Sequence, residues 1–189
     1  MHLTDEEIVQ EVLAGRKQRY AEIVTRYERP VFNLMYRYTR HEQDAADLSQ
    51  EVFLRAFERL STYRTDCSLF SWLYALAINR ANDWSRSRRR RQDGMRAYIQ
   101  EDIDLWKGSN SMAGVESRQE GRMLHKALDL LSPDTREILL LRYRHEQPVR
   151  EVAVVFGMTE SAIKMRVKRG LEQLQGILRE MHGNGPESF

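Results

Sequence analysis

The chain has 189 residues, of which 41% are hydrophobic and 31% are charged, and its formal net charge is +2. This composition is typical of a globular protein of one or two domains and excludes a disordered chain. The single cysteine, Cys67, excludes a disulfide framework and a multi-cysteine metal site, so we expect a reducing, cytoplasmic location. We expect no membrane insertion, because no signal-peptide pattern and no apolar run of about 18 residues is present.

The apolar residues recur at helical spacing along almost the whole chain, and this pattern predicts an all-α protein. Thr4 and Glu7 have the spacing of a capping box, which opens a first helix that Gly15 can end. A second helix is predicted over residues 20–39, where Pro30 would kink or split it because proline lacks a backbone donor.

A third and a fourth helix follow and complete a first helical domain over residues 1–91. The third is predicted over residues 44–60 with Asp44 as its N-cap, and the polar stretch STYRTDCS forms the turn after it. In the fourth, over residues 72–91, the apolar side chains share one side of the helix and pack within the domain. The other side presents Asn79, Asn82, Asp83 and Arg86.

Basic and aromatic residues lie at both ends of this fourth helix. Arginines fill positions 88–91, and at such density they repel one another unless a polyanion or solvent relieves the repulsion. In the stretch before the helix, Tyr63, Arg64 and Phe70 combine aromatic and basic groups, which suits an unstacked nucleic-acid base. Two plainer interpretations stay open: a solvated helix end for the arginines, and core packing for the aromatic residues.

A second helical domain is predicted after a linker in which the helical periodicity lapses. The linker covers residues 92–118, where glycines, serines and acidic residues cluster, and we expect it to be flexible, with one short helix as an open alternative within it. The second domain covers residues 119–182, and Ser132 followed by Pro133 marks a helix start inside it. Residues 183–189 form a frayed tail.

The stretch VREVAVVFGMTESAIKMRVKRGLEQL has the pattern of a helix-turn-helix. Gly157 permits the sharp left-handed turn after the first helix, and Thr159 or Glu160 opens a recognition helix over residues 160–173. The alternative is an ordinary helical hairpin with a solvated basic face. The side of the recognition helix left for water, phosphates or base edges carries Ser161, Lys164, Arg166, Lys168 and Arg169.

Each domain contains one basic helix, and an acidic linker joins the two domains. This combination favours DNA binding more strongly than either helix does alone. In this arrangement the chain resembles a bacterial RNA polymerase sigma factor of the extracytoplasmic-function (ECF) class. AADLSQEVFLRAF is similar to region 2.2 of that family, and STYRTDCSLFSWLYALAINRANDWSRSRRRR is similar to regions 2.3 and 2.4. LDLLSPDTREILLLRY and the helix-turn-helix are similar to region 4, so the resemblance covers nearly the whole chain.

The resemblance implies binding to core RNA polymerase and to promoter DNA, with no cofactor, no metal and no catalytic residue. The region 2.2 helix would dock on the clamp helices of the β′ subunit, and the β subunit would also be contacted. An anti-sigma factor would hold the protein inactive, and the linker would thread through polymerase channels. The resemblance assigns polymerase binding to Asp47, Gln50, Glu51 and Leu54.

The resemblance also assigns the DNA contacts. The loop after Tyr63 would capture a base flipped out of the −10 non-template strand, with Tyr63 stacking on it and Asn79 hydrogen-bonding to it. The implied −10 contacts are Tyr63, Arg64, Asn79, Asn82, Arg86, Arg88 and Arg89. Region 4 would read the −35 element in the major groove through Ser161, Ala162, Lys164, Arg166 and Arg169.

The recognition helix departs from the family's commonest pattern. Ala162 and Met165 stand where small hydroxyl residues are more usual, so we expect a −35 preference that differs from the standard one.

Two other classes of function compete with this interpretation. An enzyme is the weakest, because the five histidines lack metal-ligand spacing and no phosphate-binding loop or nucleophile motif is present. A stand-alone helix-turn-helix regulator is the stronger rival. It would bind an operator specifically without help, whereas a sigma factor binds promoters weakly until core polymerase is added.

Overall fold

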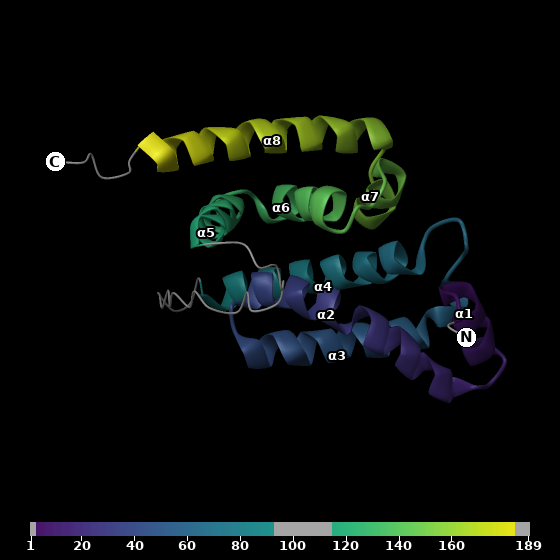
Figure 1. Cartoon of the computed structure of the whole chain (residues 1–189). Coiled ribbons are helices and arrows are strands. Elements are labelled where there is room, and N and C mark those ends of the chain that lie inside the picture. The colour runs from purple at the N-terminus through teal and green to yellow at the C-terminus, as the bar shows by residue number, and fades with distance from the viewer. Residues whose placement is uncertain (1–2, 93–114, 184–189) are drawn as a thin grey trace. The chain divides into compact units, whose positions relative to one another are not determined.

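The computed structural model describes residues 3–92 and 115–183, of which residues 91–92, 115–120 and 183 are described by their backbone only. Within these ranges all regular structure is helical, which confirms the predicted all-α fold. The chain divides into two compact units. Helices α1–α4 belong to the N-terminal unit, and α5–α8 follow in the C-terminal part of the chain (Figure 1).

The N-terminal unit consists of α1 (Asp5–Leu13), α2 (Tyr20–Thr39), α3 (Glu42–Glu58) and α4 (Leu69–Gln92). Helices α2, α3 and α4 pack against one another, and α1 packs against α2. Single 3₁₀ turns at Lys17–Arg19 and Leu60–Thr62 follow α1 and α3.

Local sequence signals set the ends of these helices. The capping box of α1 is confirmed, because the Glu7 amide donates to Thr4 Oγ1 at 3.2 Å and the Thr4 amide donates to Glu7 Oε2 at 2.7 Å. Gly15 follows the end of α1 with a positive φ of 100°, a conformation that glycine adopts without strain. Helix α2 is continuous through Pro30, so the possible split at this residue does not occur.

The predicted N-cap of α3 is wrong. The helix begins at Glu42, and the ring Nδ1 of His41 accepts from the Asp44 amide at 3.4 Å, so His41 is the N-cap and Asp44 lies in the first turn. The physical reason is the short connection: Arg40 ends α2 in the left-handed region with φ of 54°, which turns the chain directly into α3.

Two sets of buried residues hold the N-terminal helices together. Burial of each large apolar side chain contributes about 1.5–3 kcal/mol. Tyr20 also links α2 to α3, because its hydroxyl donates to the Phe53 carbonyl at 2.7 Å. One cluster joins Ile8, Val9, Val12, Ile23, Leu60 and Leu69. Along α2, α3 and α4 the buried residues include Val31, Leu34, Met35, Leu48, Val52, Leu73, Ala77 and Ile78.

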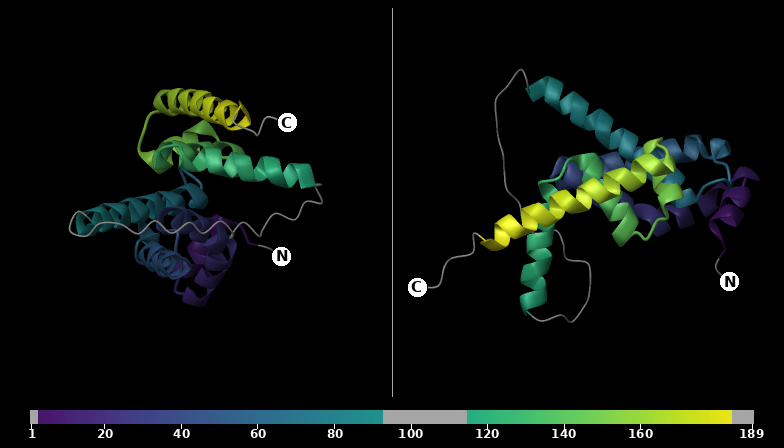
Figure 2. Two further views of the ribbon diagram at one scale, coloured as in Figure 1. Left: turned by 90° about the vertical axis from the view of Figure 1, so that its left-hand side faces the viewer. Right: turned by 90° about the horizontal axis from the view of Figure 1, so that it is seen from above.

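The C-terminal part consists of α5 (Val115–Asp129), α6 (Pro133–Leu139), α7 (Val149–Phe156) and α8 (Glu160–Gly183). A π-helical turn at Leu140–Arg144 follows α6. Helix α8 packs along α6 (Figure 1) and also contacts α5, which crosses it steeply in the view from above (Figure 2). The apolar contacts join Leu128, Leu131, Leu139 and Leu140 to Val167, Leu174 and Ile177.

The sequence signals of this part are confirmed at the start of α6, where the Thr135 amide donates to Ser132 Oγ at 3.3 Å and Pro133 is the first helical residue. Two helices are longer than predicted. Helix α5 begins at Val115, inside the stretch 92–118 that was expected to be linker, and α8 continues beyond residue 173 to Gly183. The remainder of that linker, residues 93–114, and the tail 184–189 lie outside the described residues.

Candidate nucleic-acid interface

The turn between α7 and α8 has the geometry that a helix-turn-helix requires. Gly157 has a positive φ of 60°, and the Met158 amide donates to the Ala153 carbonyl at 3.0 Å, which closes α7 in a Schellman-type turn. Thr159 then caps α8, because its Oγ1 accepts from the Ala162 amide at 3.2 Å. The left-handed turn at Gly157 and the start of α8 at Glu160 after Thr159 are therefore as the sequence predicts.

The outward side of α8 presents most of the predicted −35 contacts. Ser161, Lys164, Arg166 and Arg169 are exposed, and Ala162 is half-buried. Arg166 lies 3.7 Å from Asp134 of α6 through its Nη1, a weak and solvent-exposed pair. Lys168, which the helix pattern also places on this side, is exposed, and so is Met165, which the sequence did not predict as a contact.

A glycine sets how closely α8 approaches α6. A Cβ atom built on Gly170 would lie 2.7 Å from Thr135 Cγ2 and 3.4 Å from Leu139 Cδ1. A side chain at the first of these distances would force Thr135 to shift, so glycine allows the closest crossing of the two helices. The sequence offers no sign of this contact, because Thr135 and Gly170 are far apart in the chain.

A buried arginine joins α5 to α6. Arg136 is 6% exposed, and its Nη1 donates to Asp129 Oδ1 at 3.0 Å, while its Nε lies 3.5 Å from Glu137 Oε1. Glu137 is itself fully buried. Charged groups removed from water need such partners, so Arg136 and Glu137 are held inside the C-terminal helices and do not face DNA.

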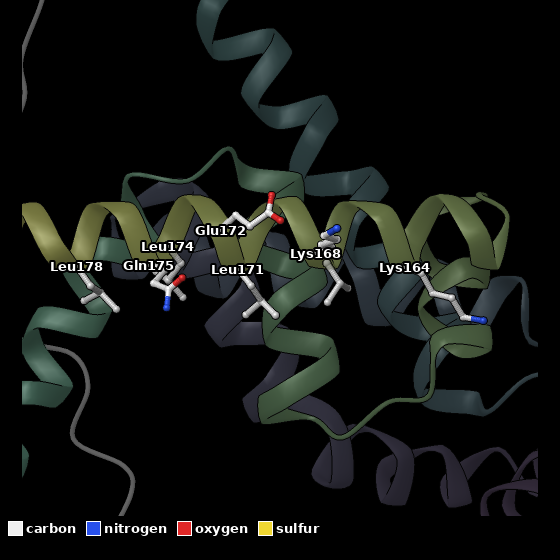
Figure 3. Close-up of a pocket in the computed structure, with 8 residues that line it drawn as sticks. Lys164, Lys168, Leu171, Glu172, Leu174, Gln175 and Leu178 are labelled. Carbon is white, nitrogen blue, oxygen red and sulfur yellow. The ribbon is translucent and has the colours of Figure 1, made fainter.

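A shallow groove runs along one side of α8 (Figure 3). Lys164, Lys168, Leu171, Gln175 and Leu178 follow one another along it at helical spacing. The groove is continuous with the basic outward side of the helix at Lys164 and Lys168.

The polar side of α4 is presented as predicted. Asn79 is exposed, and its side chain makes no hydrogen bond with the described residues, so its amide is available to an incoming group. Asn82 is half-buried. Arg86 is exposed but donates to Asp83 Oδ1 at 2.6 Å, three residues earlier on the same helix.

Within the arginine run at the end of α4, Arg88 contacts other residues of the N-terminal unit. Arg88 lies over the Trp84 ring at 5.0 Å from its centroid, and its Nη1 donates to the Thr39 carbonyl at the end of α2 at 3.2 Å. Arg89 and Arg90 are exposed. The side chain of Arg91 lies outside the described residues. The prediction treated these arginines alike, whereas Arg88 has structural contacts.

The loop of residues 63–68 before α4 is fixed by contacts with the core of the N-terminal unit. Tyr63 is half-buried against the α1 core cluster, its ring centroid lies 5.7 Å from that of Trp72, and its hydroxyl donates to the Cys67 carbonyl at 2.9 Å. Arg64 is exposed. The Ser68 hydroxyl accepts from the Ser71 amide at 3.1 Å and caps the start of α4. The loop therefore has one defined shape, which brings Arg64 to its exposed side.

The outward side of α3 carries the residues predicted to bind polymerase. Asp47, Gln50 and Glu51 are exposed, and Leu54 is 60% exposed. Glu51 Oε2 accepts from Arg80 Nε at 2.6 Å, which joins α3 to α4. The hydrogen bond from Arg80 lowers the pKa of the Glu51 carboxyl below its ordinary value. This pair links the predicted polymerase surface to the helix that carries Asn79.

Among the residues that the structure describes, no three His, Cys, Asp or Glu side chains gather as a metal site. Over those ranges, no helix has the length and apolar character needed to cross a membrane.

Comparison with known proteins decides the family. The family model of Sigma-70 region 2 matches residues 23–91, on α2–α4, and that of Sigma-70 region 4 matches residues 121–174, on α5–α8. The RNA polymerase sigma-H factor of Pseudomonas aeruginosa is 27% identical over 187 residues, which cover 93% of this chain and 96% of that protein. The chain belongs to the ECF class of sigma factors.

Further relatives agree with this assignment. The ECF RNA polymerase sigma-E factor of Escherichia coli K12 is 26% identical to this sigma factor over 188 residues, 95% of this chain and 96% of that one. Sigma factors are transcription initiation factors that bind core RNA polymerase and promoter DNA. The region 2 match also separates this sigma factor from a stand-alone regulator, which would need only the helix-turn-helix.

Solved structures show the same fold. CnrH in complex with the cytosolic domain of CnrY has a TM-score of 0.67 and 19% identity, over 93% of this sigma factor and 97% of that chain. The sigma factor RpoE of Bartonella quintana in complex with the anti-sigma factor NepR has a TM-score of 0.66 and 21% identity, over 85% and 96%.

Proposed function

We propose that this sigma factor docks on core RNA polymerase through α3, melts promoter DNA through α4 and the loop before it, and reads the −35 element through α8. Residues 1–91 and 119–182 form the two domains of this function, the second extended by the start of α5 at Val115 so that the linker between them is shorter than 92–118, and the protein acts in the cytoplasm with the polymerase. The observation that carries the proposal is the exposure of Asn79 and Leu54 on helices whose other faces are packed in the core.

The polymerase surface consists of exposed residues on one side of α3. An exposed leucine beside carboxylates and an amide suits a protein partner better than DNA, because phosphates repel the carboxylates and offer nothing to the leucine. The β′ clamp helices are the proposed partner, with Leu54 as the apolar anchor. The surface comprises Asp47, Gln50, Glu51 and Leu54.

The −10 contact combines base reading with phosphate binding. The Asn79 amide offers donors and an acceptor, which match the hydrogen-bonding edge of a base that has left the stack. Tyr63 is half-buried and its hydroxyl is already bonded to the Cys67 carbonyl, so it would contribute only the exposed part of its ring to the pocket. The phosphate contacts would come from Arg64, Asn82, Arg86, Arg88 and Arg89.

The −35 contact uses the basic outward side of α8 in the major groove. Lys164 and Arg169 are exposed, and they suit phosphate oxygens or guanine edges. Ser161 and Ala162 at the start of the helix would approach the base edges, as first-turn residues of recognition helices do. Arg166 would leave its weak pair with Asp134 to join them.

An anti-sigma factor is the proposed regulator. The solved structures of CnrH and RpoE were determined as complexes with CnrY and with the anti-sigma factor NepR. A partner that covers α3 and α8 would block polymerase and DNA together. Co-purification of a partner that competes with core polymerase for this chain would support the proposal. A co-purified partner that stays bound while core polymerase also binds would contradict it.

The main test is transcription by purified core polymerase from a genomic library of promoters. We expect Leu54→Ala to weaken core binding about tenfold, because burying a leucine side chain contributes about 1.5–3 kcal/mol and the alanine loses most of it. Leu13→Ala is the matched control, since Leu13 is a similarly exposed leucine on α1.

Asn79→Ala should leave core binding unchanged and lower open-complex formation about tenfold or more. A chain that neither binds core polymerase nor starts any transcript contradicts the proposed function.

A further inference from the structure

One exposed apolar residue lies at the centre of the outward side of α8. The core side of the helix is marked by Ile163, Val167 and Gly170, of which Ile163 and Gly170 are buried and Val167 packs against the core cluster. At about 100° per residue, Met165 lies roughly 170° around the helix from this core direction. Its side chain is 51% exposed, so the geometry and the burial agree.

Positive charge surrounds this methionine. Lys164, Arg166, Lys168 and Arg169 lie within one turn of it, and all four are exposed. Asp134 of α6 contributes one carboxylate to this side through its weak pair with Arg166, and on α8 itself the next carboxylate along this side is Glu172, two turns further along the helix. Such a surface attracts a polyanion, and an apolar group at its centre needs an apolar partner on that polyanion.

The major groove of duplex DNA offers one such partner. Each base pair presents donors and acceptors there, and the C5 methyl of thymine is the apolar group among them. A methionine thioether is long, unbranched and adaptable, so it can cover a methyl group without a fixed hydrogen-bond geometry. The hydroxyl side chains more usual at this position would offer a hydrogen bond instead.

We propose that Met165 is a specificity-determining residue that contacts the C5 methyl of one thymine in the −35 element. This inference rests on the proposed entry of α8 into the major groove. Burial of one methyl group corresponds to about a fourfold gain in affinity, so the preference for thymine at that position is modest but measurable.

The test replaces single thymines of the −35 element by deoxyuridine, which pairs identically and lacks only the methyl group. The probe is the strongest promoter found in the library assay, and binding is measured with the holoenzyme assembled from core polymerase and the full chain. We expect one replacement to weaken binding by the wild-type holoenzyme about fourfold. The Met165→Ala holoenzyme should bind both DNAs equally and as weakly as the wild type binds the deoxyuridine DNA.

Three controls keep the result interpretable. Met165 is exposed, so hydrogen exchange of α8 should be unchanged in Met165→Ala. Lys164→Ala and Arg169→Ala should weaken binding to both DNAs by the same factor.

If these two variants bind normally, the proposed entry of α8 into DNA fails. If they weaken binding but no deoxyuridine does, or if its effect persists in Met165→Ala, only the inference about Met165 is overturned. Loss of core affinity in Met165→Ala would also overturn it, because this side of α8 would then face polymerase.

Discussion

Helices α4 and α8 are both long and basic, but they use their cations differently. On α4, Arg86 is paired with Asp83, while Arg88 stacks on Trp84 and also donates to the end of α2. On α8, the exposed Lys164, Lys168 and Arg169 make no ion pair with the residues that the structure describes, and only the weak Arg166–Asp134 pair is present on its outward side. A count of arginines therefore overstates the phosphate affinity of α4.

This contrast suggests that α8 contributes mainly phosphate affinity and α4 mainly base recognition. The cations of α8 are free to bind phosphates of duplex DNA, so α8 would supply affinity that falls with salt. On α4, internal contacts hold Arg86 and Arg88, whereas Asn79 is exposed and its side chain makes no hydrogen bond with the described residues. Sequence choice in the N-terminal unit would then depend on one amide and on the shape of the loop before it.

The largest expected effect tests whether α8 is held against α6. Gly170→Ala places a Cβ 2.7 Å from Thr135 Cγ2, and we expect this crowding to destabilise the C-terminal helices by about 1–3 kcal/mol. The loss should appear as faster hydrogen exchange in α6 and α8, and as weaker −35 binding. Thr135→Ser removes the crowding methyl and should restore most of the stability in the double variant.

Gly176→Ala is the matched control on the same helix. No atom lies within 4 Å of a Cβ at this position, so the substitution should be neutral or stabilise the helix by up to about 1 kcal/mol. Equal effects of the two alanines would show that helix propensity, and not the crossing with α6, governs the result.

The second prediction compares one arginine from each helix. Arg169→Ala should lower the slope of log affinity against log salt by about one, as expected for one lost phosphate contact. Arg88→Ala should change this slope less and should instead destabilise the N-terminal unit by about 1 kcal/mol, through the lost contacts with Trp84 and Thr39. Promoter binding by the holoenzyme over a salt series, with urea unfolding of each variant, measures both effects. A larger slope change for Arg88→Ala would reverse the comparison.

The third prediction concerns the loop that precedes α4. Tyr63→Phe removes the hydroxyl that donates to the Cys67 carbonyl and keeps the ring, so we expect a loss of about 0.5–1.5 kcal/mol. Hydrogen exchange should increase in the loop residues 61–68 while α2 and α3 stay protected. If protection of the loop is unchanged, this hydrogen bond does not set the loop's shape.

The smallest predicted effect is a pH dependence of the link between α3 and α4. Because Arg80 lowers the pKa of Glu51 in the folded state, the stabilisation is complete above the carboxyl's ordinary pKa and is lost as pH falls through the lowered value. Glu51 is about half exposed, so solvent screening limits the effect to about 0.5 kcal/mol. The wild type should exceed Glu51→Gln in unfolding free energy at pH 7 by this amount, and the difference should shrink as pH falls below the ordinary carboxyl range and vanish once Glu51 is protonated in the folded state. A constant difference would exclude the ion pair as its cause.

Local signals in the sequence predicted much of the fold. The capping box at Thr4, the start at Ser132 and the turn at Gly157 each depend on residues within one turn of each other, so their spacing predicts them. The N-cap of α3 was misassigned because His41 and Asp44 can both cap, and the left-handed Arg40 decides between them.

Long-range contacts lay beyond sequence reasoning. Glu51 and Arg80 are 29 positions apart, and Thr135 meets Gly170 only through the crossing of two helices. The partners of Arg88 were hidden for the same reason, since Thr39 lies on another helix. Exposure of Asn79 and Leu54 agrees with the family-based assignment, and their functions stay predictions.

The most direct test of the account is the promoter preference of the Asn79→Ala holoenzyme, measured as transcription from a library in which every −10 and −35 position is varied. The account predicts that the preference is lost at one −10 position and is kept at the −35 positions, while core binding is unchanged. A uniform loss of transcription with every preference intact, or a changed preference in the −35 element, would contradict the assignment of base reading to Asn79.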